Sequence, residues 1–117
     1  MSTNPQRVYK VCPEIDWISA RAAGYHHGSA DDRRDGFIHL STREQLAGTL
    51  AKHYRGQRDL LLVAFDAGAL APGLQWEPSR GGALFPHLYG PLPAGAALAV
   101  TPLALGSDGV PQLPEEF

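Results

Sequence analysis

Two histidines lie in short apolar runs that alternate in the manner of β-strands. His39 stands in "GFIHL" and His87 in "LFPHLY", and each run ends at once in a polar or Gly-Pro break. Side chains point alternately to the two faces of a strand, so Phe37 and His39 share one face. By the same rule, Phe85, His87 and Tyr89 share a face. If the two strands are neighbours, they form a cleft with two imidazoles and up to three aromatic rings.

Such a cleft is suited to a flat heteroaromatic ligand. Aromatic rings stack on a planar ligand, and an imidazole donates to a hydroxyl or moves a proton near neutral pH. We therefore take His39 and His87 as candidate catalytic residues. Glu77, which follows Trp76, is a third candidate as an acid, a base or an acceptor for a ribose hydroxyl. Its alternative role is a surface ion pair.

Anion-binding groups flank both histidine strands. Ser41 comes directly after the first strand, where the N–H groups of a helix start could hold a phosphate. Arg80, followed by two glycines, could close over an anion. In the competing interpretation both histidines are structural and bond within the fold, and the protein is a non-catalytic binding module for a small molecule or a protein.

A metal site is not expected. His26 and His27 precede Asp31, Asp32 and Asp35, but adjacent histidines in coil point apart, and the spacing matches no metal motif. We therefore expect an exposed loop over residues 25–36.

Two helices are predicted in the N-terminal half. The first begins at Pro13 and stops at Gly24, with one apolar face expected to be buried. The second begins at Ser41, which with Glu44 fits a capping box. Its buried stripe is predicted to contain Leu46, Leu50 and Tyr54. The face of the first helix consists of Ile15, Ile18 and Ala22.

Most predicted strands follow these helices. Residues 7–11 form a first strand, and "LLLVAF" (60–65) reads as a central strand covered on both faces. "LQWE" is a short strand, and the strand of His87 is placed at an edge or beside a bulge because it contains Pro86. A last strand is expected over residues 96–105. This order predicts an α+β domain with a mainly antiparallel sheet.

The composition is that of one globular domain. The chain has 117 residues, of which 44% are hydrophobic, and we expect a single domain over residues 1–117 with its core in 7–105 and a loosely held tail in 106–117. A net charge of −2 gives no reason to expect broad nucleic-acid or membrane binding. A lone cysteine, Cys12, excludes an internal disulfide, and no run of about 18 apolar residues occurs. We expect a cytoplasmic protein.

Three blocks of the sequence resemble a known family. "DGFIHLSTREQLAGTL", "DLLLVAFD" and "LQWEPSRGGALFPHLYGPLP" are similar to recurrent blocks of the domain of unknown function 952 family, small bacterial and plant proteins. The resemblance runs from about Val8 to Leu105. It implies a split β-sheet similar to that of ADP-ribosyltransferases, which bind NAD.

The resemblance also implies roles for single residues. His39 in "FIHLST" matches the histidine that binds a ribose hydroxyl, with Ser41 or Thr42 beside the ligand. Tyr89 or His87 would stack on nicotinamide or assist the transfer. The sequence departs from the transferase pattern because "FPHLYGPL" contains no glutamate, and Glu77 is the substitute.

Overall fold

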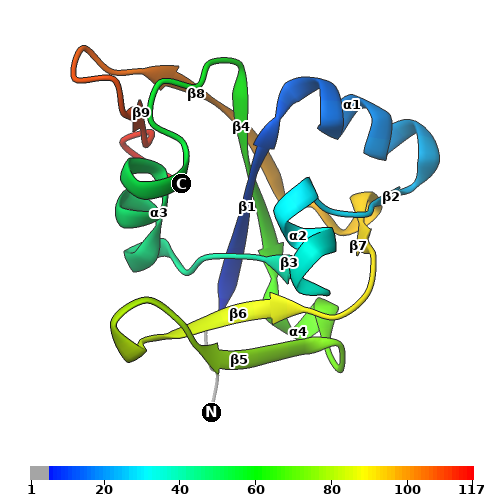
Figure 1. Ribbon diagram of the computed structural model, residues 1–117. Coiled ribbons are helices and arrows are strands. Elements are labelled where there is room, and N and C mark those ends of the chain that lie inside the picture. The colour runs from blue at the N-terminus through cyan, green and yellow to red at the C-terminus, as the bar shows by residue number, and fades with distance from the viewer. Residues whose placement is uncertain (1–5) are drawn as a thin grey trace.

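The protein is described by a computed structural model over residues 6–117, and it has a mixed α+β fold (Figure 1). Long antiparallel strands run through the middle of the molecule, and a second small sheet runs crosswise beneath them. In chain order the elements are β1 (Arg7–Pro13), α1 (Glu14–Ala23), β2 (Tyr25–His26), α2 (Ala30–Asp35), β3 (Ile38–His39), the 3-10 helix η1 (Arg43–Gln45), α3 (Leu46–His53), β4 (Leu60–Asp66), α4 (Ala67–Leu70), β5 (Leu74–Pro78), η2 (Arg80–Gly82), β6 (Leu84–Leu88), β7 (Leu92–Pro93), η3 (Ala94–Ala96), β8 (Ala99–Leu105) and β9 (Pro111–Gln112).

The first sheet is built around β4. Within residues 6–117 its strand order is β1-β4-β8-β9, and β4 pairs antiparallel with both long neighbours. Every residue of β4 from Leu60 to Phe65 is buried. This confirms the prediction that the uninterrupted apolar run is a central strand, because only a strand covered on both faces needs apolar side chains at every position.

The second sheet carries both histidines. Its order is β3-β6-β5 in the described part of the chain, and the register of β3 and β6 places His39 directly opposite His87. Of the two places predicted for the strand of Pro86, at an edge or beside a bulge, the edge is wrong, since β6 lies in the middle. The proline is accommodated because β3 already ends at His39: Leu40 N donates to Pro86 O at 3.0 Å, and proline has no N–H to return the bond.

Buried side chains form two clusters among the described residues, one on each face of the first sheet. Successive residues of β1 point to opposite faces, so Val8 belongs to one cluster and Tyr9 to the other. Leu46 and Leu50 of α3 belong to the second cluster, as the predicted stripe requires. The capping box of this segment lies one residue later than predicted, at Thr42 and Gln45.

Helix α1 occupies the predicted residues but turns the opposite face to the core. Trp17 and Ala20 are buried, whereas Ile15 and Ile18 are 72% and 59% exposed. In a helix of this length two stripes with i, i+3 spacing are available, and the larger apolar ring of Trp17 is the one that reaches Phe65, at 6.3 Å between ring centroids.

The segment 25–36 is not the exposed loop that we predicted. It contains β2, which pairs with β7, and the six-residue helix α2. Ser29 and Asp32 cap this helix reciprocally, and Gly36 ends it with a φ of 85°, a conformation that glycine adopts without strain. Asp32 is buried, so this polar residue of the segment makes its contacts inside the protein and not with solvent.

The C-terminal residues also differ from their prediction. Instead of a loosely held tail, β9 pairs with the end of β8, and Val110, Leu113 and Phe117 pack against the second cluster. The ring of Phe117 lies 5.6 Å from that of Tyr9, and the Arg43 guanidinium lies 4.2 Å above it. None of the helices in residues 6–117 has the length and apolar composition needed to cross a bilayer.

Candidate functional site

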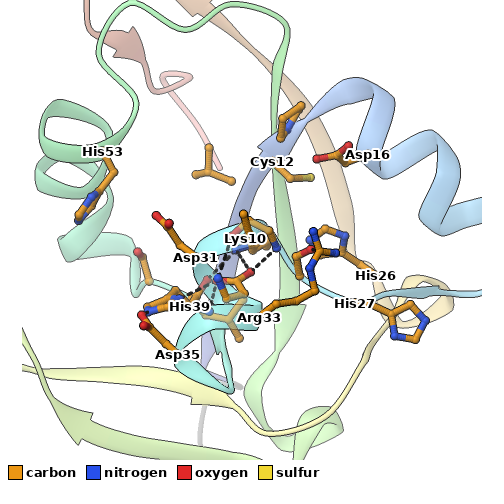
Figure 2. A pocket seen from close by; sticks show the side chains of 18 of the residues that line it. Lys10, Cys12, Asp16, His26, His27, Asp31, Arg33, Asp35, His39 and His53 are labelled. Carbon is orange, nitrogen blue, oxygen red and sulfur yellow. Dashed lines mark hydrogen bonds and ion pairs between the residues drawn. The ribbon is translucent and has the colours of Figure 1, made fainter.

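His39 and His87 meet in the wall of one cleft. Their paired positions on β3 and β6 bring the ring centroids to 5.6 Å, in an edge-to-face arrangement. Both belong to the lining of a cleft of about 760 Å³ that extends between β1, α1, α2 and the end of α3. Figure 2 shows His39 beside Lys10 at the centre of this cleft, with His53 of α3 and Cys12 of β1 on opposite sides.

A buried ion pair anchors His39. Lys10 Nζ lies 2.8 Å from Asp32 Oδ2, and the two side chains are 3% and 2% exposed. The other oxygen of Asp32 lies 2.6 Å from His39 Nδ1. Since a carboxylate accepts only, Nδ1 carries the proton in this contact. The chain from β1 through α2 to β3 is therefore Lys10, Asp32, His39, and its members come from three separate elements.

The second nitrogen of His39 also faces a carboxylate. Nε2 lies 3.0 Å from Asp35 Oδ2, at the C-terminal end of α2. Asp35 additionally forms a two-point contact with Arg34, at 2.9 and 3.2 Å. In the doubly protonated ring each nitrogen donates to one carboxylate.

His87 has a carboxylate partner of its own. Its Nδ1 lies 2.8 Å from Glu77 Oε1, and Tyr89 Oη donates to the same oxygen at 2.7 Å. Phe37 stacks on the His87 ring with a centroid distance of 4.0 Å and lies 4.6 Å from the His39 ring. Because Glu77 occupies Nδ1, Nε2 of His87 is the nitrogen with a free lone pair when the ring is neutral.

The surroundings shift several pKa values. Burial by itself would raise the pKa of Asp32, but the hydrogen bond from His39 and the charge of Lys10 outweigh burial and hold it well below its usual range. Hydrogen bonds from Tyr89 and His87 lower the pKa of Glu77. Both carboxylates are therefore ionised at neutral pH and act as acceptors for the histidines.

Other groups in the cleft are held in their neutral forms. Burial raises the pKa of Cys12 to about 11 and that of Tyr54 to about 12. Burial and the charge of Lys10 lower the pKa of His26, whose buried Nε2 has no hydrogen-bond partner within the part of the chain that the structure describes. Cys12 is thus a thiol at neutral pH, which makes it a poor nucleophile.

The predicted site residues divide into a cleft wall and a backing layer. His39, His87, Ser41 and Phe85 belong to the wall. The Ser41 hydroxyl is already paired with that of Thr49, at 2.9 Å, so it is not the open phosphate site that the sequence indicated. The backing layer, outside the wall, consists of Phe37, Glu77 and Tyr89.

One predicted ligand-binding residue, Thr42, takes neither place. Thr42 is the first residue before η1, where its N–H donates to Gln45 Oε1 at 3.0 Å and its side chain takes part in the cap. Arg80 begins η2, and its side chain lies outside the described part of the structure.

Sequence reasoning missed Lys10, Asp32 and Asp35 as members of the site. Lys10 stands in the middle of an apolar strand, where a lysine is nearly always paired if it is buried, and this was a usable signal. Asp32 lies three residues after Ser29 and four before Gly36, a spacing that is typical of a short capped helix. Among residues 6–117, no cluster of three or more histidine, cysteine or acidic side chains has the geometry to hold a metal ion.

Comparison with known proteins identifies relatives without a described activity. The family model for proteins of unknown function DUF952 matches residues 11–100. The crystal structure of protein CC0527 from Caulobacter crescentus, a structural genomics target, is 49% identical, with 91% of this chain and 93% of that chain covered and a TM-score of 0.88. The solution NMR structure of CC0527 is 49% identical, covers 91% of each chain and has a TM-score of 0.81. None of the curated proteins matches the sequence. Because the family model covers most of the chain, the protein belongs to the DUF952 family of unknown function.

Proposed function

We propose that the protein binds NAD or a related nucleotide in the cleft and transfers an ADP-ribosyl or similar group with the help of His39 and His87. The observation that carries this proposal is the pair of facing imidazoles in the cleft wall, each bonded to a carboxylate. Histidine–carboxylate pairs are a common arrangement for proton transfer near neutral pH.

The size of the cleft supports a ligand of this class. Its volume of about 760 Å³ falls in the usual range for small-molecule and cofactor pockets, about 300–1,000 Å³. The specific ligand comes from the ADP-ribosyltransferase-like fold that the family resemblance of the sequence implies, in which His39 would hold a ribose hydroxyl. Tyr89, to which the resemblance gives the stacking role, lies outside the cleft wall beside Phe37, so it supports the site from behind and does not stack on a ligand in the cleft.

In the proposed transfer the bond between the ribose C1′ and nicotinamide breaks, and its electron pair leaves with nicotinamide. The oxygen of an acceptor hydroxyl, or of water, forms the new bond to C1′. The proton of that hydroxyl passes to Nε2 of His87. Glu77 acts through His87 in this scheme, because its Oε1 already accepts from both His87 and Tyr89 and it does not line the cleft.

Binding without turnover is the second candidate. It is favoured by the burial of His87, which is 5% exposed and covered by the Phe37 ring. In this case the same cleft retains a small molecule, and the histidines contribute structure and hydrogen bonds only.

A titration of the isotope-labelled protein with NAD, ADP-ribose and nicotinamide tests the proposal. At millimolar ligand we expect saturable NMR shifts at residues around His39 and His87. His39→Asn should weaken binding about tenfold, the cost of losing one hydrogen bond to the ligand. His27→Asn, which replaces an exposed histidine at the cleft edge, is the matched control and should bind normally.

The outcomes separate the two candidates. Saturable binding followed by release of free nicotinamide supports transfer. Saturable binding without nicotinamide release supports the binding module. If none of the three compounds shifts residues around the two histidines, the nucleotide proposal is refuted.

A further inference from the structure

We propose that Asp32, held by Lys10, is a positioning residue that keeps a proton on Nδ1 of His39 and thereby makes Nε2 the atom that meets a ligand. The role of Nε2 toward a ligand rests on the proposed function. The position of the proton does not, because it follows from the contacts within the free protein.

The carboxylate of Asp32 is fixed at both oxygens. Oδ1 accepts from His39 Nδ1 at 2.6 Å and from the His39 backbone N–H at 3.1 Å. Oδ2 accepts from Lys10 Nζ at 2.8 Å and from the Ser29 backbone N–H at 2.9 Å. A rotation of the carboxylate would break contacts at both oxygens in a buried site, which is costly.

The same pair also fixes the main chain of His39. Lys10 Nζ donates to His39 O at 3.2 Å, while Asp32 accepts from His39 N. The ring, the N–H and the carbonyl of His39 are therefore all set by the Lys10–Asp32 pair. One buried ion pair thus determines both where the imidazole lies and which way it is turned.

The contact on the other ring nitrogen is of a different kind. Asp35 lies 3.0 Å from Nε2, and its side chain is 31% exposed. Arg34 competes for the same carboxylate at 2.9 and 3.2 Å. Exposed ion pairs contribute little and exchange readily with water. A hydroxyl group of a ligand, which can donate to Nε2, can therefore replace Asp35 there, whereas Nδ1 is occupied by the buried carboxylate of Asp32.

The other charged and titratable groups around the His39 ring do not change which of its nitrogens carries the proton. His87 faces His39 at 5.6 Å between centroids, and Glu77 lies beyond it on the Nδ1 side of His87. When His39 is neutral, its single proton should therefore stay on Nδ1, against the buried carboxylate. An isolated histidine side chain prefers the opposite form, with the proton on Nε2, so the tautomer is diagnostic.

The experiment is a measurement of ring nitrogen shifts in protein labelled with ¹⁵N-histidine, without ligand, from about pH 5 to about pH 8. We expect the neutral His39 ring of the wild type to carry its proton on Nδ1. Asp35→Asn should leave this tautomer in place. Asp32→Asn should change it to the Nε2–H form or to a mixture. If Asp32 had only a structural role, Asp32→Asn would change the free energy of unfolding, but the tautomer of His39 would not depend on this one carboxylate.

Two results would overturn the inference. The first is a neutral wild-type His39 with its proton on Nε2. The second is an Asp35→Asn variant that shifts the tautomer as strongly as Asp32→Asn does. If Asp32→Asn fails to fold, the wild type and Asp35→Asn still give the answer. Failure of nucleotide binding would leave this result intact, so the two proposals can fail separately.

Discussion

The carboxylate of Asp32 links the site to the acid stability of the protein. In the folded state the hydrogen bond from His39 and the charge of Lys10 hold its pKa below the ordinary value in spite of burial. An unfolded chain returns Asp32 to a pKa of about 3.9. The unfolded state therefore takes up this proton first as the pH falls, and the stabilisation is complete only above that value.

We predict that the free energy of unfolding decreases steadily below about pH 5 and is lower by about 1 kcal/mol at about pH 3 from this group, since one proton changes it by at most about 1.4 kcal/mol per pH unit. Urea unfolding at a series of pH values between about pH 7 and about pH 3 measures this decrease in the free energy of unfolding. A Lys10→Met/Asp32→Asn double variant, which removes both charges of the buried pair, should show a shallower decline. Asp31→Asn, an exposed carboxylate on the same helix, is the control and should keep the wild-type slope. Equal slopes in all three proteins would contradict the assignment.

At the scale of elements, α2 is the segment that brings Asp32 into place. A six-residue helix is far too short to be stable alone. Ser29 caps it by accepting from Asp32 N at 3.1 Å and donating its own N–H to Asp32 Oδ2. The carboxylate of Asp32 thus belongs both to the cap and to the site, so a change in the cap should alter the environment of His39.

We predict that Ser29→Ala lowers the free energy of unfolding by about 1 kcal/mol, the usual effect of losing a capping side chain. Thermal and urea unfolding measure this change. The histidine ring shifts should move at His39 but not at His53. Ser107→Ala, at an exposed turn, is the matched control. A variant with unchanged stability and unchanged His39 shifts would show that the cap does not support the site.

Sequence patterns predicted the long elements better than the short ones. The apolar run of β4 and the stripe of α3 are repeated signals, and burial follows them directly. Helix α2 has no such signal, because all of its residues after Ala30 are charged and it is held by one buried contact. The buried face of α1 was predicted wrongly because neighbouring segments decide between two equivalent stripes. Each histidine face could be predicted from strand alternation, and the partner carboxylates could not, since they come from other elements.

At the scale of the whole molecule, the position of β6 decides that there is a shared site. His39 and His87 are far apart in the sequence, and β6 joins them because it pairs with β3 on one side and β5 on the other. The same pairing places Glu77 of β5 opposite Phe85 and within reach of His87. The sheet therefore assembles both histidines and one of the carboxylates, and α2 supplies the others.

The C-terminal segment braces this arrangement from the far side of β1. Tyr9 exchanges backbone hydrogen bonds with Ser41, at 2.8 and 2.9 Å, two residues after His39. The ring of Tyr9 packs against Phe117, which also lies beneath the guanidinium of Arg43. Phe117 is thus connected to the segment that follows His39 both through Tyr9 and through Arg43.

We predict that Phe117→Ala lowers the free energy of unfolding by about 2 kcal/mol, because it removes a half-buried ring and a cation–π contact. Urea unfolding at neutral pH measures the loss, and Glu116→Ala, an exposed neighbour, should have no effect. Arg43→Ala should account for only part of the loss, since the contact of Phe117 with Tyr9 remains in that variant. If Phe117→Ala and Glu116→Ala unfold alike, the Phe117 ring does not contribute to the fold, and its contact with Tyr9 does not support Ser41 and His39.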